Sequence, residues 1–290
     1  MLDKIRKFIP RRWRTDAPII PVVRLTGTIA AGGSQFRPSL SIASTAALLE
    51  RAFGMKQAPV VAIIINSPGG SPVQSRLIYK RIRDLAQEKD KKVLIFVEDA
   101  AASGGYMIAC AGDEIIADPC SVIGSIGVVA ATFGFSDAIS RIGVERRVYT
   151  AGTSKVSLDP FQKEKKEDVA KLNVLLADMH AVFINLVKQG RGAKLADNPN
   201  IFTGQYWLAE KALALGLIDS IGDIRSVIKT RYGEKAEMRL ISAPRGLFGR
   251  RAGMPAVASI AEAGAGLADE ALGRIDEQAL WARLGLSVPR

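Results

Sequence analysis

INSPGGSPVQS, residues 65–75, joins an apolar run to a predicted helix. The run that leads into it, Val60–Ile65, is rich in β-branched residues, and this composition predicts a buried strand. Ser71 followed by Pro72 is typical of a helix N-cap and first helical position, and Gln74 completes a predicted capping box. The stretch therefore predicts a strand that passes through a tight turn directly into a helix.

The turn itself contains two adjacent glycines, Gly69 and Gly70. A strand that ends in a glycine turn before a helix N-terminus presents free backbone N–H groups, which stabilise an anion or the oxyanion of acyl transfer. Glycine also lets another segment of backbone approach closely. The stretch has neither the Gly-Lys-Ser/Thr of a P-loop nor the GxGxxG of a dinucleotide site. It indicates an oxyanion site, with a purely structural turn as the alternative.

Strand and helix patterns alternate along most of the chain. Strands are predicted at 19–25, 60–65, 93–97, 114–117 and 144–150, and helices at 44–53, 72–87, 103–111, 163–188, 205–215 and 224–231. This alternation is typical of an α/β domain, which we place at residues 18–241.

Both ends of the chain differ from this domain. Residues 1–17 form a basic N-terminal arm, and residues 242–290 form a Gly/Arg linker followed by an Ala-rich helical C-terminal extension. One hypothesis is that the extension reaches a neighbouring active site, where it is trimmed or acts as a plug. The alternative is a helix docked between subunits.

Composition limits the class of protein. The chain has 290 residues, of which 48% are hydrophobic and 24% are charged, as in a globular protein with a substantial core. No apolar run reaches the roughly 18 residues of a membrane span. The two cysteines, Cys110 and Cys120, argue against a disulfide scaffold and are predicted to be buried thiols in a reducing compartment. No metal-ligand cluster or nucleotide motif is evident, so no cofactor and no metal are predicted.

Positive charge is concentrated at the N-terminus. The net charge is +11, and Met1–Arg14 holds six basic residues and one acidic residue. This arm predicts either a weak contact with an anionic membrane surface or a solvated terminus. Nucleic-acid binding is not expected, because no basic–aromatic motif occurs elsewhere. The predicted location is cytoplasmic, peripheral to the inner face of the membrane.

A second glycine-rich stretch suggests chemistry. In EDAAASGGYMIACAGDEIIADPCSVIGSIGV, residues 98–128, Ser103 stands between small alanines and two glycines at a predicted helix start. The N–H of Gly104 adjoins its hydroxyl, which gives a nucleophile beside an oxyanion donor. The alternative is that Ser103 only caps the helix. The single histidine, His180, lies inside a predicted helix and reads as structural, so a lysine is the better candidate for a base.

Four stretches together resemble peptidase family S49, the signal peptide peptidase A group of serine peptidases. They are INSPGGSP, ASGGYMIACAGDEIIADP, GSIGV and IFTGQYWLAEKALALGLIDSIGD, and with their spacing they cover roughly residues 20–235. The resemblance implies a ClpP/crotonase-like fold, a spiral of ββα units.

The resemblance also implies roles for individual residues. Ser103 is the expected nucleophile, and its expected base is Lys155 in TAGTSKVSLDPF, 52 residues later (155 − 103). The N–H groups of Gly70 and Gly104 are expected to form the oxyanion hole. Ser125, in GSIG, is expected to orient the lysine.

Substrate contacts are implied at the first turn. There Gly69, Ser71 and Pro72 are expected to pair with an extended peptide. The expected activity is that of a serine endopeptidase with a Ser-Lys dyad, which cleaves small or unfolded peptides, such as signal-peptide remnants, through an acyl-enzyme.

A lysine base sets a condition on its surroundings. Free lysine has a pKa near 10.4, so a base working near neutral pH needs a downward shift of roughly 3 units, which burial supplies. In the family, burial comes partly from assembly, with serine and lysine of one site contributed by neighbouring protomers. A ring-like homo-oligomer is therefore expected. The alternatives are a non-catalytic membrane-associated scaffold of the same fold and a crotonase-like acyl-CoA enzyme.

Overall fold

The computed structural model describes residues 17–32, 39–152, 155–242, 274–275 and 277–288. The predicted basic contact through Met1–Arg14 and the predicted linker after residue 242 lie outside the described residues, so both stay predictions.

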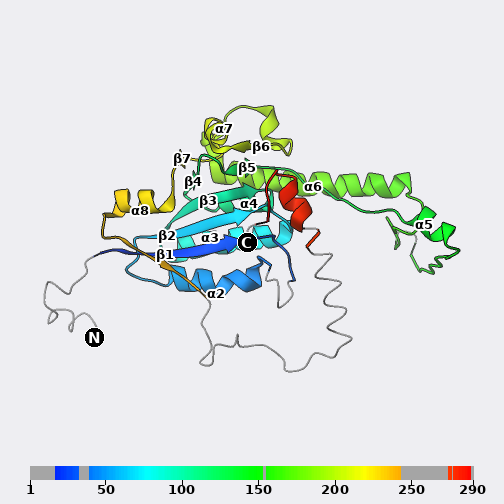
Figure 1. The fold of residues 1–290 in the computed structure, drawn as a ribbon, viewed down its shortest axis with the longest axis horizontal. Coiled ribbons are helices and arrows are strands. Elements are labelled where there is room, and N and C mark those ends of the chain that lie inside the picture. Colours follow the sequence, from blue (N-terminus) through cyan, green and yellow to red (C-terminus); the bar gives the residue numbers. More distant parts are fainter. Residues whose placement is uncertain (1–16, 33–38, 153–154, 243–273, 276, 289–290) are drawn as a thin grey trace, which may run out of the picture.

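The described residues form one mixed sheet of eight strands, which confirms the predicted α/β class (Figure 1). The strands are β1 (Ile19–Thr26), β2 (Val60–Ser67), β3 (Lys92–Ala102), β4 (Glu114–Ala117), β5 (Val122–Gly124), β6 (Tyr206–Leu208), β7 (Ser220–Ile221) and β8 (Glu237–Leu240). Their order is β6-β5-β3-β2-β1-β8, and β4 pairs with β3 and β7. The β5–β6 pair is antiparallel and the other pairs are parallel.

Helices cover both faces of this sheet. They are α2 (Ile42–Phe53), α3 (Pro72–Glu88), α4 (Gly104–Ala109), α5 (Ser136–Arg141), α6 (Lys166–Arg191), α7 (Ala209–Ala214) and α8 (Ile224–Tyr232), with the short 3-10 helices η2 (Gly192–Lys194) and η3 (Pro199–Phe202). Residues 277–282, near the C-terminus, are also helical.

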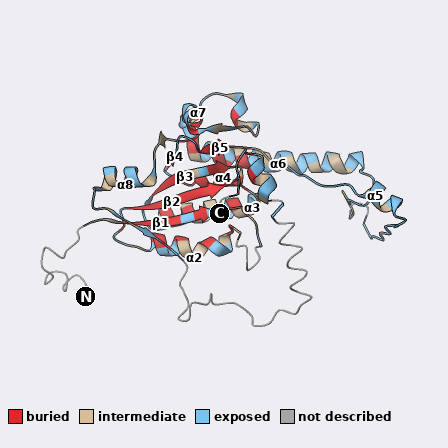
Figure 2. Ribbon diagram, in the orientation of Figure 1, coloured by how far each residue is buried: buried red, intermediate tan, exposed pale blue. Residues whose placement is uncertain are grey.

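The central strand β2 explains why the apolar run is continuous. All eight of its residues are buried, because alternate side chains enter two different cores. Ile63 and Ile65 join the core formed with α2, α3 and α4, whereas Ala62 and Ile64 join the core beneath α8. Figure 2 shows the strands as the buried centre of the molecule, with exposure concentrated on the outer helices.

A long segment leaves this core. Residues 128–152 and 155–165, which we call the projecting segment, hold α5, and α6 returns from them to the sheet (Figure 1). Phe135 donates its N–H to the carbonyl of Pro160, and the Arg146 guanidinium pairs with Asp159, so the two limbs of the segment contact each other. The predicted strand at 144–150 is wrong, since these residues have no strand partner within the described part of the chain.

The helix α6 is long, and its N-terminal part extends away from the sheet (Figure 1). By length and composition alone, Lys166–Lys194 is the one helix in the described residues that is apolar enough to span a membrane, and 11% of its apolar window is buried. The buried contacts lie towards its C-terminal half, at Phe183, Leu186 and Val187. Val174 and Val182 are among its exposed apolar residues.

Three smaller predictions were also wrong. The predicted helix at 205–215 is strand β6 followed by the short helix α7. Gln74 does not close a capping box, because its Oε1 accepts the N–H of Ile42 at 3.0 Å and so ties α3 to α2. Cys120 is exposed rather than buried, while Cys110 is buried, and both are free thiols.

Candidate active site

The two glycine-rich stretches touch each other at the carboxyl ends of β2 and β3. A Cβ atom placed on Gly69 would lie 2.7 Å from the Cβ of Ser103 and 2.9 Å from the N of Gly104. A Cβ on Gly70 would lie 2.1 Å from the carbonyl oxygen of Ile29. Both glycines also have positive φ, +106° and +138°, which side chains disfavour. Bare backbone is therefore required at both positions.

Ile29 holds this turn in an extended form. Its N–H donates to the carbonyl of Gly69 at 2.9 Å, and its carbonyl accepts the N–H of Ser71 at 2.8 Å. This pairing skips the N–H of Gly70, for which the described residues supply no hydrogen-bond acceptor. The same is true of Gly104, whose N–H stands at the start of α4, where a helix leaves its donors unpaired.

Ser103 occupies the N-cap position of α4 in a sparsely populated conformation. Its φ and ψ are 52° and −123°, and its hydroxyl makes no capping hydrogen bond. The alternative that it serves as a helix cap is therefore excluded. Its N–H donates to the carbonyl of Gly124 at 2.8 Å, and its carbonyl accepts the N–H of Met107, so backbone contacts on both sides hold the unusual conformation.

Close packing brings the start of α4 against the turn. A Cβ on Gly104 would lie 2.2 Å from the Oγ of Ser75, and a Cβ on Gly105 would lie 2.6 Å from the carbonyl oxygen of Ser67. The paired glycines of SGG thus let α4 approach the β2–α3 turn, just as Gly69 lets the turn approach Ser103.

A pocket of about 740 Å³ opens above these residues. It gathers six of the predicted site residues, namely Gly70, Ser71, Pro72, Ser103, Gly104 and Ser125. Gly69, the seventh, packs directly against Ser103. Much of the remaining lining is apolar and includes Met107, Val128, Val129, Met179 and Phe183.

The segment after β5 forms one side of the pocket. Ser125 has a φ of 53° and donates its N–H to the carbonyl of Gln205 at 2.7 Å. The Nε2 of His180 lies 3.1 Å from the carbonyl oxygen of Ile126, which links α6 to this segment. The single histidine therefore contacts the segment that carries Ser125 and is not among the residues that line the pocket.

Lys155 is not brought to the pocket within one chain. It is exposed on the projecting segment, and it is absent from the pocket lining. Its N–H donates to the carbonyl of Gly152, a local contact of that segment. The structure therefore unites the predicted nucleophile with the predicted oxyanion donors and leaves the predicted base elsewhere.

Sequence reasoning missed the residues that complete the pocket. Met179 and Phe183 come from α6, and Leu280, Arg283 and Leu284 come from the C-terminal segment. The apolar spacing of α6 predicted a helix without indicating which elements it would contact. Trp281, a large aromatic residue in an otherwise Ala-rich stretch, was the one signal of docking at the C-terminus.

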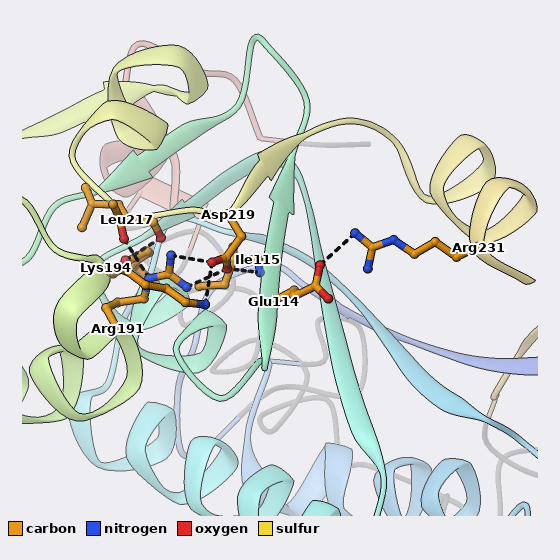
Figure 3. A network of polar contacts seen from close by, with 9 residues as sticks. Glu114, Ile115, Arg191, Lys194, Leu217, Asp219 and Arg231 are labelled. Carbon is orange, nitrogen blue, oxygen red and sulfur yellow. Dashed lines mark hydrogen bonds and ion pairs between the residues drawn. The ribbon is translucent and has the colours of Figure 1, made fainter.

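A charged network joins the end of α6 to the loop before β7 (Figure 3). Arg191, with a side chain 1% exposed, donates two hydrogen bonds to Asp219, and Lys194 donates one at 2.6 Å. Partial burial pushes the pKa of Asp219 upward, but the hydrogen bonds from Arg191 and Lys194 outweigh it and the pKa falls to about 2.

Buried groups beside this network are inert. The Tyr106 hydroxyl donates to the carbonyl of Leu217 at 2.8 Å and fixes α4 to the loop before β7. Burial raises the pKa of the neighbouring Cys110 thiol to about 12. A protonated, fully buried thiol is neither nucleophile nor metal ligand, and the described residues contain no cluster of His, Cys, Asp and Glu able to hold a metal ion.

Comparison with known proteins defines the class. The family model of peptidase family S49 matches residues 85–237, a range that contains both Ser103 and Lys155. The chain belongs to peptidase family S49, and the family resemblance of its sequence motifs is thereby confirmed.

Among the relatives of this chain, some are named as proteases and others as a sodium/proton antiporter. It is 32% identical over 225 residues to a probable protease SohB of Haemophilus influenzae, covering 75% of this chain and 63% of that protein. It is 57% identical over 288 residues to a protein of Brucella abortus named Na(+)/H(+) antiporter NhaA, covering 97% of this chain and 39% of that protein. The chain thus spans about two fifths of the length of that first relative.

Among solved structures, a mutant of the 1510-N membrane-bound stomatin-specific protease in complex with a substrate peptide matches 79% of this chain and 94% of its own. The sequence identity is 19% and the TM-score is 0.47.

Proposed function

We propose that this chain is a serine endopeptidase in which Ser103 is the nucleophile. The observation that carries the proposal is the contact of Gly69 with Ser103 and Gly104, which brings one hydroxyl and two unpaired N–H groups to one pocket. Ser103 also has a positive φ and a hydroxyl that does not cap the helix, and backbone outliers of this kind cluster at active sites.

The reaction follows from this arrangement. The base takes the hydroxyl proton of Ser103 as its Oγ attacks a peptide carbonyl, and the N–H groups of Gly70 and Gly104 bind the resulting oxyanion. The amine leaves with a proton from the base, and water then hydrolyses the acyl-enzyme. Removal of an oxyanion donor in acyl-transfer enzymes typically costs about 10²–10³ in rate, so this hole is a major part of the proposed catalysis.

We propose that Lys155 of a neighbouring copy is the base. The proposal rests on three facts: Lys155 lies outside the pocket of its own chain, it is exposed, and its segment exposes large apolar residues such as Phe133 and Tyr149. Covering those residues with a second copy would also remove water from the lysine, and desolvation lowers the pKa of a lysine. Ser125, which lines the pocket, would then orient the incoming amine.

Two inactive variants test this sharing. Ser103→Ala and Lys155→Ala proteins are purified separately and then mixed under conditions that exchange subunits. Hydrolysis of an unfolded, fluorescently labelled protein is expected to be lost in each variant alone and to return in the mixture. Hybrid assemblies that stay inactive would place serine and base in the same chain, or remove Lys155 from the mechanism.

We propose peptides in extended conformation as substrates. Ile29 pairs with Gly69 and Ser71 through backbone hydrogen bonds, as one strand pairs with another, so the turn is extended at these residues. The extended stretch ends at Pro72, where α3 begins. The apolar lining by Met107, Met179 and other residues favours apolar side chains, as in small unfolded peptides or signal-peptide remnants.

We further propose that the protein works at the inner face of a membrane, as a peripheral protein. The support is the basic composition of Met1–Arg14 and the exposed apolar surface of α6. Co-sedimentation with anionic and with neutral vesicles tests it, and equal recovery with both would contradict the electrostatic part. This chain covers 39% of the Brucella relative, so the ion transport in that protein's name is not proposed for this chain.

A further inference from the structure

The C-terminal segment, residues 277–288, is built into the wall of the pocket of its own chain. Trp281 is fully buried and Leu284 is 8% exposed, and both pack on Ala100, Ala102 and Val122. Ala102 directly precedes Ser103. The segment is thus anchored at the strand end that presents the serine.

Small residues make this docking possible. Ala100 and Ala102 leave space beside β3 that the Trp281 indole fills, and the indole is held by apolar packing, since its N–H finds no acceptor among the described residues. The Tyr206 hydroxyl adds one directional contact, donating to the carbonyl of Arg283 at 2.9 Å. Strand β6 and the C-terminal segment therefore stand side by side at the pocket rim.

This docking brings one charge to an otherwise uncharged pocket. Among the described residues that line the pocket, Arg283 alone carries a charge. Its side chain is exposed and makes no ion pair with a described residue. Leu280 and Leu284 flank it and continue the apolar lining.

We propose that Arg283 is a specificity-determining residue, which selects peptides that place a carboxylate at the pocket rim beside apolar side chains. This inference rests on the proposed peptidase function and names part of its substrate class. A guanidinium binds a carboxylate through paired, charge-assisted hydrogen bonds, whereas it gains little from an amide of the same size. The carboxylate can be that of an acidic side chain or that of a free peptide C-terminus.

Peptide binding to the full chain carrying Ser103→Ala tests the inference without turnover. Leu/Ala-rich peptides with Asp or Asn at each position in turn, and with a free or amidated C-terminus, are compared by calorimetry. We expect at least one Asp peptide, or the free acid, to bind on the order of tenfold more tightly than its neutral counterpart. The arm that shows the preference identifies the source of the carboxylate.

Variants assign the preference to Arg283. Adding Arg283→Ala is expected to abolish it and Arg283→Glu to reverse it, while Arg225→Glu, an equal charge change on the exposed face of α8, leaves it intact. A second variant, Trp281→Phe, keeps an aromatic anchor and is expected to weaken the preference only partly. Equal binding of charged and neutral peptides, an unchanged preference in Arg283→Ala, or binding of no peptide would overturn the inference. Because no step needs catalysis, a failed peptidase proposal is recognised separately, by the absence of Ser103-dependent turnover.

Discussion

Gly69 and Ser103 lie 34 positions apart in the sequence (103 − 69). In the folded chain they are packed against each other. Position 69 carries no side chain, and any side chain there would displace the nucleophile. The N–H groups of Gly70 and Gly104 have no hydrogen-bond partner among the described residues. The strained backbone of Ser103 is the counterpart, because in this conformation the hydroxyl makes no capping hydrogen bond and the residue lines the pocket.

The contact predicts the effect of one methyl group. Gly69→Ala is expected to abolish reaction with a serine-directed probe, because its Cβ would overlap the Cβ of Ser103 and the N of Gly104. Its positive φ adds a cost of about 1 kcal/mol in unfolding free energy. Probe labelling and urea unfolding measure the two effects separately.

Gly233→Ala is the matched control. Gly233 has a similar φ of +95° at the end of α8, but nothing lies within 4 Å of its Cβ position. It should lose a comparable amount of stability and label normally. Normal labelling of Gly69→Ala would show that the contact with Ser103 is dispensable.

At the scale of elements, one carboxylate ties the end of α6 to the loop before β7 and to strand β4. Arg191 and Lys194 reach Asp219, whose carboxylate also accepts the N–H of Ile115 on β4 at 2.8 Å (Figure 3). One carboxylate thus joins helix, loop and sheet. Because Arg191 is buried, loss of its partner leaves an uncompensated charge.

The Asp219 network predicts a defined acid sensitivity. The pKa of Asp219 is lowered to about 2 from 3.8, so its contribution is complete above pH 3.8 and is lost as the pH falls towards and below 2. The corresponding loss in the free energy of unfolding is about 2 kcal/mol. Asp219→Asn should be about 3 kcal/mol less stable at neutral pH and should lack this part of the pH dependence.

Urea unfolding between pH 2 and pH 7 measures this difference. Asp137→Asn on the exposed helix α5 provides the control and should follow the wild type throughout. Parallel pH curves for Asp219→Asn and the wild type would contradict the assignment.

Local patterns predicted the elements that are regular and buried. The apolar runs of β1, β2, β3 and β4 and the periodic helices α2, α3, α6 and α8 were recognisable, because burial imposes periodicity on them. The strands β5, β6 and β7 are only two or three residues long, and such lengths carry no periodic signal. Residues 144–150 have a strand-like composition but no partner in the single chain, and composition cannot supply one.

The site was predictable to a similar degree. Ser103, Gly70 and Gly104 stand in glycine motifs at strand ends, and parallel strands bring such ends together, whereas Ser125 was expected only from the family resemblance. The proposed role of Arg283 could not be predicted, since its placement depends on docking of Trp281 against Ala100 and Ala102, which lie about 180 positions earlier in the chain. The role of Lys155 stays a prediction, because one chain does not bring it to the pocket.

At the scale of the molecule, the projecting segment is the feature that a monomer does not explain. Tyr149, Phe133 and Ile142 are 90%, 78% and 74% exposed, and the segment stands beyond the free end of α6 (Figures 1 and 2). Large apolar residues gathered on one extension are typical of a surface that another molecule covers. In the proposed account, that molecule is a second copy.

This account predicts that assembly can be broken without unfolding. Ile142→Asp is expected to shift the protein to monomer and to remove its peptidase activity while the chain stays folded, because Ile142 is 74% exposed within one chain. Light scattering after size exclusion reports the mass. Leu240→Asp, at a 60% exposed position on β8, is the control and should keep both assembly and activity. An active, verified monomer would contradict the shared site.

The most direct test of the central claim is labelling with a fluorophosphonate, read by intact mass, on the full chain and on Ser103→Ala and Lys155→Ala. The account predicts one adduct per chain in the wild type and none in either variant, because Ser103 is the nucleophile and Lys155 activates it. A wild-type protein that stays unlabelled as a verified oligomer, or a Ser103→Ala protein that gains the adduct, would contradict it.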